Sequence, residues 1–540
     1  MKRTFLLAAL LLVPALRAAR SQEALDLAIR NGTVVDGSGR RAFRADVGVR
    51  GGMIVKVGDL GGLPAREVID AAGLIVAPGF IDVHTHADGI DSTPLAENFV
   101  RMGVTTVVAG NCGGSTLQVA EAFRKIREVG ISVNFATLVG HNSVRRAVMG
   151  GERRAPTAEE LARMKELVAR AMSEGAVGLS TGLEYVPGAY AATDEIVELA
   201  RVAAAAGGIY ASHLRNEGTA IEQAVEEAIR VGESARCPVQ ISHIKIDSPS
   251  RWGRSRRVLA MIDAARARGV TVQADQYAYT AASSSLSIRF PAWALEGGQQ
   301  EIGRRLSDSA VWERIKPEMV EMLRGRGFRD LSWAVVASCR ADRSLEGLSL
   351  KEIALQRRGE SSSDAQLETA RELMLQGGAG MVYHLMSEDD LRRFMRHPEV
   401  SFGSDSGVLA LGEGMPHPRG YGNNARVLGY YVRRMKVLRL EEAVRKMTSL
   451  AASQFAFADR GLIREGYAAD LVLFDRQRIE DRATYTQPHH YPEGIAAVIV
   501  NGVPVLRDGR HTGARPGRPL VSRRSGSRPQ VPRGTGNLEQ

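Results

Sequence analysis

The sequence lacks the features of a disulfide-stapled or membrane-spanning protein. It contains only three cysteines in 540 residues, too few for a disulfide framework. Beyond residue 13, no apolar run is long enough to cross a bilayer. The glycine-rich residues 110–114 are not followed by Gly-Lys-Ser/Thr, so they do not indicate a phosphate-binding loop. We therefore expect a globular protein with an ordinary hydrophobic core.

The positive charge of the chain is concentrated at its two ends. The formal net charge is +10. Residues 1–21 contain four basic and no acidic side chains, and residues 507–540 contain eight arginines against two acids. The body between these segments is therefore close to neutral. It predicts no basic face and no nucleic-acid partner.

The first residues have the pattern of a secretory signal. Lys2 and Arg3 precede an apolar run at residues 5–13, and small residues follow near Ser21. So short an apolar run indicates a signal peptide, with an uncleaved anchor as the alternative. We predict a signal peptide over residues 1–21, a periplasmic or secreted location, and no stable membrane insertion after cleavage.

Apolar strands alternate with helical segments in the middle of the chain, which indicates βαβ units and a parallel sheet. The expected strands are residues 80–83, 104–109, 133–138, 177–180, 209–212, 239–242, 271–274 and 400–403. Short β-strands dominate both flanks. We therefore predict an α/β protein with a (β/α)₈ TIM-like barrel over residues 78–460. A small β-sandwich domain is formed from both termini, residues 22–77 and 461–513.

Two segments fall outside this alternation. The long gap between the seventh and eighth strands predicts a helical insertion at about residues 280–399, which would cover the active-site face of the barrel. Residues 514–540 are rich in Gly, Pro, Arg and Ser and predict a disordered basic tail. The sequence gives no indication of an oligomeric state.

Metal-binding side chains follow five of the expected strands. Residues two apart on a strand point to the same side, so His84 and His86 can project together into the mouth of the barrel. Barrel active sites lie at these carboxyl ends of the strands. Thiol, imidazole and carboxylate groups are the ligands that zinc prefers. The predicted ligands are His84, His86, Cys112, His213, His243 and Asp405.

Several longer motifs contain or follow these ligands. They include APGFIDVHTHAD at 77–88, GNCG at 110–113, SHLRNE at 212–217, SHIK at 242–245, GSDSG at 403–407 and HPRGYGNNARVLG at 417–429. With these motifs the chain resembles the amidohydrolase superfamily and, within it, the D-aminoacylase (N-acyl-D-amino-acid deacylase) family. Many superfamily members bridge two metals with a strand-four lysine, but residues 179–183 contain none. The resemblance implies that Cys112 bridges instead. It implies one tightly bound Zn²⁺ on Cys112, His213 and His243, and a second, weaker position on His84, His86, Cys112 and Asp405.

This ligand set leads to a hydrolytic mechanism. Zinc lowers the pKa of bound water to roughly 7, and the resulting hydroxide attacks an amide carbonyl. Asp405, the expected catalytic residue, would pass the water proton to the leaving nitrogen. The resemblance implies a small-molecule substrate, an N-acyl-D-amino acid cleaved to a carboxylate and a D-amino acid. The alternatives are another amide, such as a D-dipeptide or a cyclic amide, or a zinc-containing binding protein without activity.

The resemblance implies the contacts of Lys245, Tyr277 and a serine with the substrate, whereas those of Arg289, Tyr185 and Glu184 are inferred from their positions in the sequence. Lys245 shares a face with His243 and would meet the substrate α-carboxylate, with a surface lysine as the alternative. Tyr277 and one of the serines at 283–285, assigned to Ser283, match positions for the same carboxylate. Arg289 either favours an acidic side chain or is solvated. Tyr185 is expected to line the pocket, while Glu184 lines it or pairs with Arg145.

Overall fold

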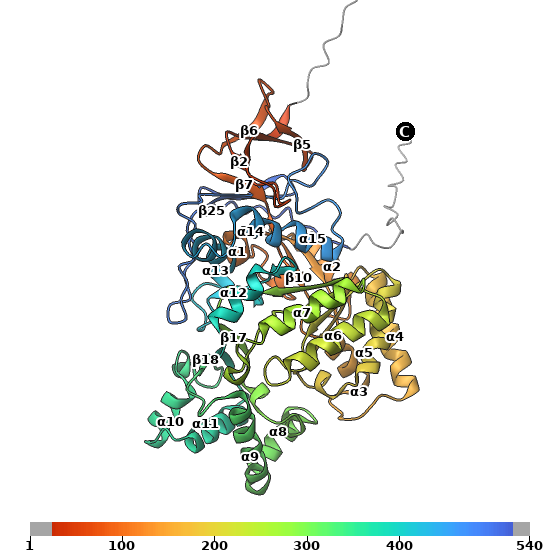
Figure 1. The fold of residues 1–540 in the computed structure, drawn as a ribbon, viewed down its shortest axis with the longest axis vertical. Helices are drawn as coiled ribbons and strands as arrows, with labels where there is room; N and C mark the ends of the chain where they lie inside the picture. Colours follow the sequence, from red (N-terminus) through yellow and green to blue (C-terminus); the bar gives the residue numbers. More distant parts are fainter. Residues whose placement is uncertain (1–23, 522–540) are drawn as a thin grey trace, which may run out of the picture.

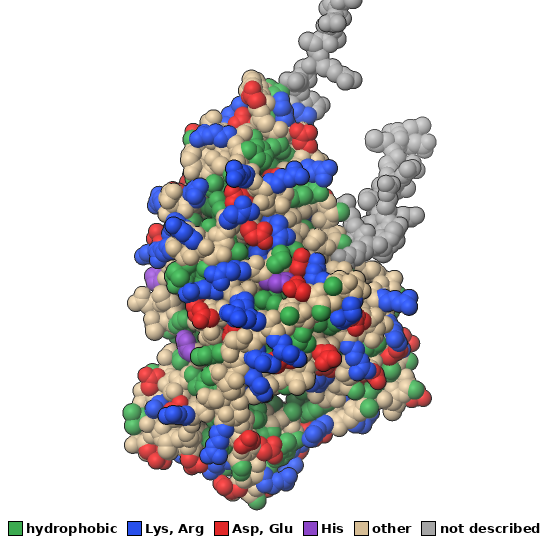
Figure 2. Space-filling model, in the orientation of Figure 1, with side chains coloured by type: hydrophobic (Ala, Val, Ile, Leu, Met, Phe, Trp, Pro, Cys, Tyr) green, Lys and Arg blue, Asp and Glu red, His purple; other side chains and the backbone are tan. Residues whose placement is uncertain are grey.

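The computed structural model describes residues 24–521. The molecule is elongated, with a β-sandwich at one end, the parallel strands in the middle and the 280–386 region at the other end (Figure 1). The predicted signal peptide, residues 1–21, lies outside the described residues. Among those described, no helix has both the length and the apolar character to cross a membrane. On the face in Figure 2, acidic and basic side chains are interspersed.

The β-sandwich combines strands from both ends of the described chain. One sheet has the order β5-β4-β1-β6, with β1 Leu25–Arg30, β4 Asp46–Arg50, β5 Met53–Gly58 and β6 Ala65–Asp70. The other has the order β25-β24-β23-β22-β7-β2-β3, with β2 Thr33–Val34, β3 Phe43–Arg44, β7 Ile75–Pro78, β22 Leu471–Phe474, β23 Ile495–Val500, β24 Val503–Arg507 and β25 Arg510–His511. Leu27 and Val49 share one buried cluster with Leu471 and Ile499. The sandwich therefore closes over side chains that lie more than 400 positions apart in sequence.

Parallel strands form the centre of the molecule in strict sequence order. They are β8 Phe80–Asp82, β10 Val104–Ala109, β11 Asn134–Thr137, β12 Val139–Gly140, β13 Gly178–Gly182, β14 Ile209–His213, β15 Val239–Ile241, β16 Val272–Gln276 and β20 Val400–Phe402. Strands β8, β10 and β11 pair in one sheet, and β12, β13, β14, β15, β16 and β20 pair in a second. Only Leu138 separates β11 from β12. Strand β9 (Thr85–His86) pairs in parallel with β21 (Ser406–Gly407), which brings the ends of the first and last strands together. This is the strand order of a (β/α)₈ barrel.

Helices connect and cover these strands. They are α1 Glu97–Arg101, α2 Val119–Val129, α3 His141–Met149, α4 Ala158–Ser173, α5 Thr193–Ala205, α6 Ile221–Ala235, α7 Ser255–Ala267, α12 Glu388–Arg396, α13 Arg419–Arg426, the π-helix Val427–Arg434, α14 Leu440–Met447 and α15 Ser449–Phe455. Helix α4 begins with a capping box, in which Thr157 and Glu160 satisfy each other's backbone N–H groups. Strand β10 is buried along its whole length, as expected for a parallel strand covered on both faces.

The insertion is not purely helical, so that prediction was wrong in part. It contains α8 Gln299–Ser307, α9 Ser309–Arg326, α10 Leu350–Arg358 and α11 Ser363–Leu375, together with an antiparallel sheet of β17 Ala281–Ser285, β19 Gly380–His384 and β18 Ala334–Ser338. Strand β17 has the sequence AASSS, which lacks the β-branched and aromatic residues that usually mark strands. The insertion has its own core around Trp312 and Tyr383. It ends before α12, which packs on α7 and β20 of the barrel.

The prediction of a disordered tail was wrong for its first residues, 514–521. Residues 514–521 are described and run beside β11. Gly517 N donates to Ile131 O at 2.8 Å, Phe135 N donates to Arg518 O at 2.9 Å, and Leu520 N donates to Phe135 O at 2.7 Å. A Cβ on Gly517 would lie 2.0 Å from Val133 O, so glycine permits this close approach. Composition alone suggested disorder, but backbone hydrogen bonds need no particular side chains. The rest of the tail, residues 522–540, lies outside the described residues.

Candidate metal centre

The six predicted ligands meet at the carboxyl ends of the barrel strands. They are His84 after β8, His86 in β9, Cys112 after β10, His213 at the end of β14, His243 after β15 and Asp405 after β20. Their donor atoms form two groups, each with all atoms within 4.8 Å of one another: His84, His86, Cys112 and Asp405, and Cys112, His213 and His243. Cys112 belongs to both groups and lies between them.

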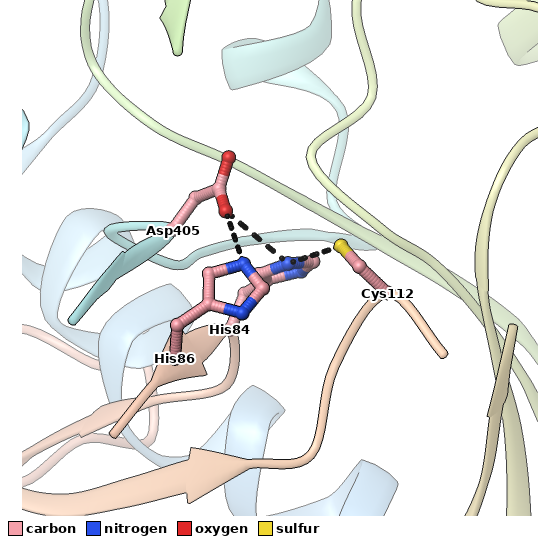
Figure 3. A group of neighbouring side chains, drawn as sticks. All are labelled: His84, His86, Cys112 and Asp405. Atoms are coloured by element: carbon pink, nitrogen blue, oxygen red, sulfur yellow. Dashed lines mark hydrogen bonds and ion pairs between the residues drawn. The ribbon is translucent and has the colours of Figure 1, made fainter. Parts of the chain in front are cut away.

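The first group converges on Asp405 and Cys112 (Figure 3). Asp405 Oδ1 lies 3.0 Å from His86 Nε2 and 3.5 Å from His84 Nε2. His84 Nε2 is in turn 3.3 Å from Cys112 Sγ. In the second group, Cys112 Sγ lies 3.7 Å from His213 Nδ1 and 3.5 Å from His243 Nε2.

This spacing fits zinc. Two ligand atoms on a tetrahedral zinc, at bond lengths of roughly 2.0–2.3 Å, lie about 3.3–3.7 Å apart. The sulfur–nitrogen distances around Cys112 are 3.3, 3.5 and 3.7 Å. His213 Nδ1 and His243 Nε2 lie closer, at 2.8 Å. The donor set of one thiol, imidazoles and a carboxylate is also the one zinc prefers.

Three of these residues have an unusual backbone conformation. Cys112, His243 and Asp405 have positive φ angles of 53°, 32° and 52°. Few non-glycine residues adopt this region, and those that do cluster at functional sites. In each case the chain turns directly after a strand, which directs the side chain into the mouth of the barrel.

Carboxylates contact the ring nitrogens of three histidines that face away from Cys112. His213 Nε2 lies 3.3 Å from Glu184 Oε2, and His243 Nδ1 lies 3.0 Å from Glu217 Oε1. Asp275 Oδ1 lies 3.3 Å from His84 Nδ1 and accepts a hydrogen bond from His243 N at 2.8 Å. Such contacts fix the tautomer and orientation of metal-binding histidines. The sequence analysis missed Glu217 and Asp275. Asp275 follows residues 271–274, so the strand-end criterion applied to that strand would have found it.

Asp405 has a cationic partner that the sequence analysis also missed. Arg419 Nη2 lies 2.9 Å from Asp405 Oδ2, and both side chains are buried. Burial opposes ionisation of Asp405, but Arg419 and the nearby imidazoles outweigh it and hold the pKa of this carboxyl well below its usual range. Arg419 stands in the HPRG sequence at 417–420, so the signal was present but had no assigned role.

The predicted substrate residue Lys245 is buried, so a surface lysine is excluded. Its Nζ donates to Glu217 Oε1 at 2.6 Å and to His243 O at 2.9 Å, and lies 2.8 Å from His243 Nδ1. Burial opposes its charge, but Glu217 outweighs it and raises the pKa of Lys245. Tyr277 is fully buried beside it, with the Arg419 guanidinium 4.5 Å from its ring centre. Lys245 therefore borders the pocket while also supporting His243.

Arg289, Ser283 and Tyr185 lie around the same space. Arg289 is buried over the ring of Tyr383, 4.6 Å from its centre, so the solvated alternative is wrong. Its Nε and Nη1 have no hydrogen-bond partner among the described residues. Tyr185 OH lies 3.4 Å from His213 Nδ1 and accepts a hydrogen bond from Ser284 Oγ at 3.2 Å. Ser283 and Ser284 both line the cavity.

Glu184 does not pair with Arg145. Arg145 Nη1 binds Glu195 Oε2 at 2.5 Å, and Glu195 Oε1 lies 2.9 Å from His141 Nε2. This buried trio links α3 to α5 and takes no part in the metal group. Glu184 borders the pocket instead, with Arg326 as its cationic partner.

A small cavity of about 20 Å³ lies at the centre of the site. It has room for roughly one water molecule. Barrel residues His213, His243 and Asp405 form one wall, and insertion residues such as Ser283 and Arg289 form the other. Larger cavities of about 460 and 470 Å³ flank it and share wall residues with it. The larger of these two cavities is lined by Asp405 and therefore reaches the metal group directly.

Comparison with known proteins places this geometry in a family. The model of the Amidohydrolase family matches residues 67–301 and 359–506. Two curated relatives come from Alcaligenes xylosoxydans xylosoxydans. A D-aminoacylase is 38% identical over 92% of this chain and 97% of its own length, and an N-acyl-D-glutamate deacylase is 39% identical with the same coverage.

Solved structures of similar proteins support the same family. An N-acyl-D-glutamate deacylase from Bordetella bronchiseptica, complexed with zinc and a phosphonate mimic of the tetrahedral intermediate, matches with a TM-score of 0.79 and 37% identity. The match covers 93% of this chain and 100% of that one. A D-aminoacylase structure has the same TM-score and identity, covering 92% and 100%. These matches confirm the predicted fold class. The chain belongs to the amidohydrolase family, in the group of D-aminoacylases and N-acyl-D-amino-acid deacylases.

Proposed function

We propose that this protein is a zinc-dependent enzyme that hydrolyses the amide bond of N-acyl-D-amino acids, releasing a carboxylate and a D-amino acid. The observation that carries the proposal is the position of Cys112 Sγ, within 3.3–3.7 Å of three imidazole nitrogens at the ends of three different strands. The Asp405 carboxylate lies across the same group. Relatives that match nearly their whole length bear the names of D-amino-acid deacylases.

Cys112, His213 and His243 would hold one zinc tightly. His84, His86, Cys112 and Asp405 would form a second, weaker position. Zinc at such a site acts as a Lewis acid on a carbonyl oxygen and lowers the pKa of water. The carboxylates of Glu184 and Glu217 keep His213 and His243 oriented toward the metal group.

Asp405 carries the proton. Its low pKa leaves it as a carboxylate able to accept a proton from water at Oδ1. It then donates this proton to the leaving nitrogen, because a free amide anion is a poor leaving group. Arg419 holds the other oxygen, Oδ2, at 2.9 Å, which leaves Oδ1 facing the histidines. A binding protein without activity would need no acid at this position.

Two cationic side chains, Lys245 and Arg289, line the cavity. Lys245, Tyr277 and Ser283 would bind the α-carboxylate, and Arg289 would bind an acidic side chain with its unpartnered N–H groups. An arginine in a buried aromatic cage is suited to a carboxylate because its fork presents paired donors. We therefore propose a preference for an acidic D-amino acid, such as D-glutamate. The alternative substrate is another amide, a D-dipeptide or a cyclic amide, cleaved at the same site.

The cellular location follows from residues 1–21. Their basic start and short apolar run support export, so the enzyme would act in the periplasm or outside the cell.

A substrate panel tests the function. The zinc-loaded protein lacking residues 1–21 is assayed with N-acetyl derivatives of D- and L-methionine and D- and L-glutamate, and a chelator-treated sample is the control. We expect hydrolysis of the D isomers only, fastest with D-glutamate, and no activity without zinc. Activity confined to L isomers would contradict the stereochemistry, and equal activity with and without zinc would contradict the mechanism.

A further inference from the structure

Arg326 connects the insertion to the metal group from outside it. It is the last residue of α9 and is buried, with 7% of its side chain exposed. Its Nη1 forms an ion pair with Asp247 Oδ2, and its Nη2 lies 3.3 Å from Glu184 Oε1. Glu184 and Asp247 come from the loops after β13 and β15. One guanidinium therefore joins the insertion to two loops of the barrel.

The end of α9 is fixed on the barrel at this point. Ser250 Oγ donates to Gly325 O at 2.8 Å. Gly327 caps the helix with a φ of 88°, and a Cβ there would lie 2.9 Å from Ser250 N. A left-handed glycine is the usual helix stop, and here it also permits contact with the barrel loop. The position of Arg326 is thus defined by backbone contacts as well as by its ion pairs.

Glu184 connects Arg326 to the metal group. One of its oxygens faces Arg326, while the other, Oε2, lies 3.3 Å from His213 Nε2. His213 presents its other nitrogen, Nδ1, to Cys112 Sγ at 3.7 Å. If Nδ1 is the ligand atom, Nε2 carries the proton and donates it to Glu184. The carboxylate therefore selects the tautomer of His213 that can bind a metal.

We propose that Arg326 is a positioning residue through which the insertion holds Glu184, and thereby His213, in the geometry that binds zinc. The inference rests on the metal site of the proposed function and assigns that site a support outside the barrel. Docking of the insertion and metal affinity are then coupled, because the same guanidinium serves both.

Other charges near Glu184 do not replace this contact. Lys245 is hydrogen-bonded to Glu217 at 2.6 Å. The charge of Arg289 also favours the ionised form of Glu184, but its guanidinium lies over the ring of Tyr383 and forms no ion pair with that carboxylate. Without Arg326, Glu184 and Asp247 would be left as buried carboxylates short of a partner. A buried carboxylate without a partner is costly and turns toward another cation, which removes the acceptor that orients His213.

The test measures metal affinity, so it requires no substrate. Arg326→Met and Arg326→Lys are compared with Arg324→Met, an exposed arginine in the same helical turn with no side-chain partner among the described residues. Zinc dissociation constants come from competition with a chromophoric chelator, and the visible spectrum of the cobalt-loaded protein reports ligand geometry. We expect Arg326→Met to weaken zinc binding about 10- to 100-fold and to alter the cobalt bands. Arg326→Lys should restore part of the affinity, and Arg324→Met should behave as wild type.

A double variant separates positioning from general structural damage. If Arg326 acts through Glu184, Arg326→Met in a Glu184→Gln background should weaken zinc binding less than threefold further. Circular dichroism checks that each variant folds. If Arg326→Met misfolds, Arg326→Lys and Glu184→Gln with their double variant give the same comparison. Wild-type zinc affinity and cobalt spectrum in folded Arg326→Met, or full additivity with Glu184→Gln, would overturn the inference. Since metal binding is measured directly, a wrong substrate assignment would leave this result intact.

Discussion

Replacement of Asp405 by Asn is the sharpest test of the chemistry. Asn keeps the size of the side chain but can neither accept nor deliver the proton. Asp405 Oδ1 lies 3.0 Å from His86 Nε2, and Oδ2 lies 2.9 Å from Arg419 Nη2. Cys112, His213 and His243 are untouched, so we expect the variant to retain about one zinc per chain. Metal analysis after dialysis measures this retention.

The magnitude follows from the two roles of the carboxylate. Loss of a general acid–base group typically lowers kcat by about 10²- to 10⁴-fold, which corresponds to roughly 2.7–5.4 kcal/mol of barrier. The Arg419 charge is also left buried without its partner, and breaking a buried pair costs about 3–5 kcal/mol of stability. The variant should therefore be both slower and less stable than wild type.

A second variant separates these two effects. Asp405→Asn combined with Arg419→Met removes the unpaired cation as well as the carboxylate. If the loss of rate reflects proton transfer, kcat stays low in the double variant while stability to denaturant partly returns. If activity returns with stability, the rate loss came from charge imbalance, and the proton-carrier role of Asp405 is wrong. Asp405→Asn with more than a tenth of wild-type kcat would contradict it directly.

Three further changes have defined outcomes. Arg289→Met should lower kcat/KM for N-acetyl-D-glutamate about 10- to 100-fold, since a hydrogen bond to a charged group contributes about 1.5–3 kcal/mol. The kcat/KM for N-acetyl-D-methionine should fall much less. An equal loss on both substrates would contradict binding of the acidic substrate side chain by Arg289. Burial opposes ionisation of Glu195, but His141 and Arg145 lower the pKa of this carboxyl below the unfolded value of 4.5. The ionised Glu195 therefore stabilises the folded state above pH 4.5, and this contribution is lost as the pH falls below that value. Urea denaturation of wild type and Glu195→Gln from pH 3 to 7 should thus show a stability difference that shrinks toward acid, and a constant difference would contradict the argument. Truncation after residue 513 removes the three backbone hydrogen bonds to Ile131 and Phe135. It should cost about 3 kcal/mol of stability at ~1 kcal/mol each relative to a chain ending at residue 521. Equal stability of the two chains would mean that these contacts contribute nothing.

The positions of the metal-binding residues were predictable because they obey a local rule. Each follows a short apolar strand, and parallel strands in a barrel all end at the same rim. His84 and His86 also have the two-residue spacing that places side chains on one face. Neither argument needs any knowledge of tertiary contacts. The structure brings all six side chains to one place for the reason the sequence indicated.

The charged partners of these residues could not be predicted in the same way. Arg419 lies 14 positions after Asp405 in the helix α13, and no periodicity links the two. Arg326 lies 142 positions from Glu184, in a different subdomain. An ion pair depends on where two backbones meet in space, so a sequence with many arginines offers many equivalent candidates. Strand β17 was missed for a related reason, since AASSS becomes a strand only by pairing with β19.

The barrel and the insertion supply different parts of the site. All six candidate ligands come from barrel strands or the turns directly after them, where buried neighbours on both faces fix the backbone. Ser283, Arg289 and Tyr383, which form the opposite wall of the cavity, come from the insertion. Substitutions in the insertion should therefore change substrate preference without affecting metal content. Arg326 is the exception, because its guanidinium contacts a carboxylate that also holds a histidine. An insertion docked through such a contact links the wall proposed to select the substrate to the residues proposed to hold the metal.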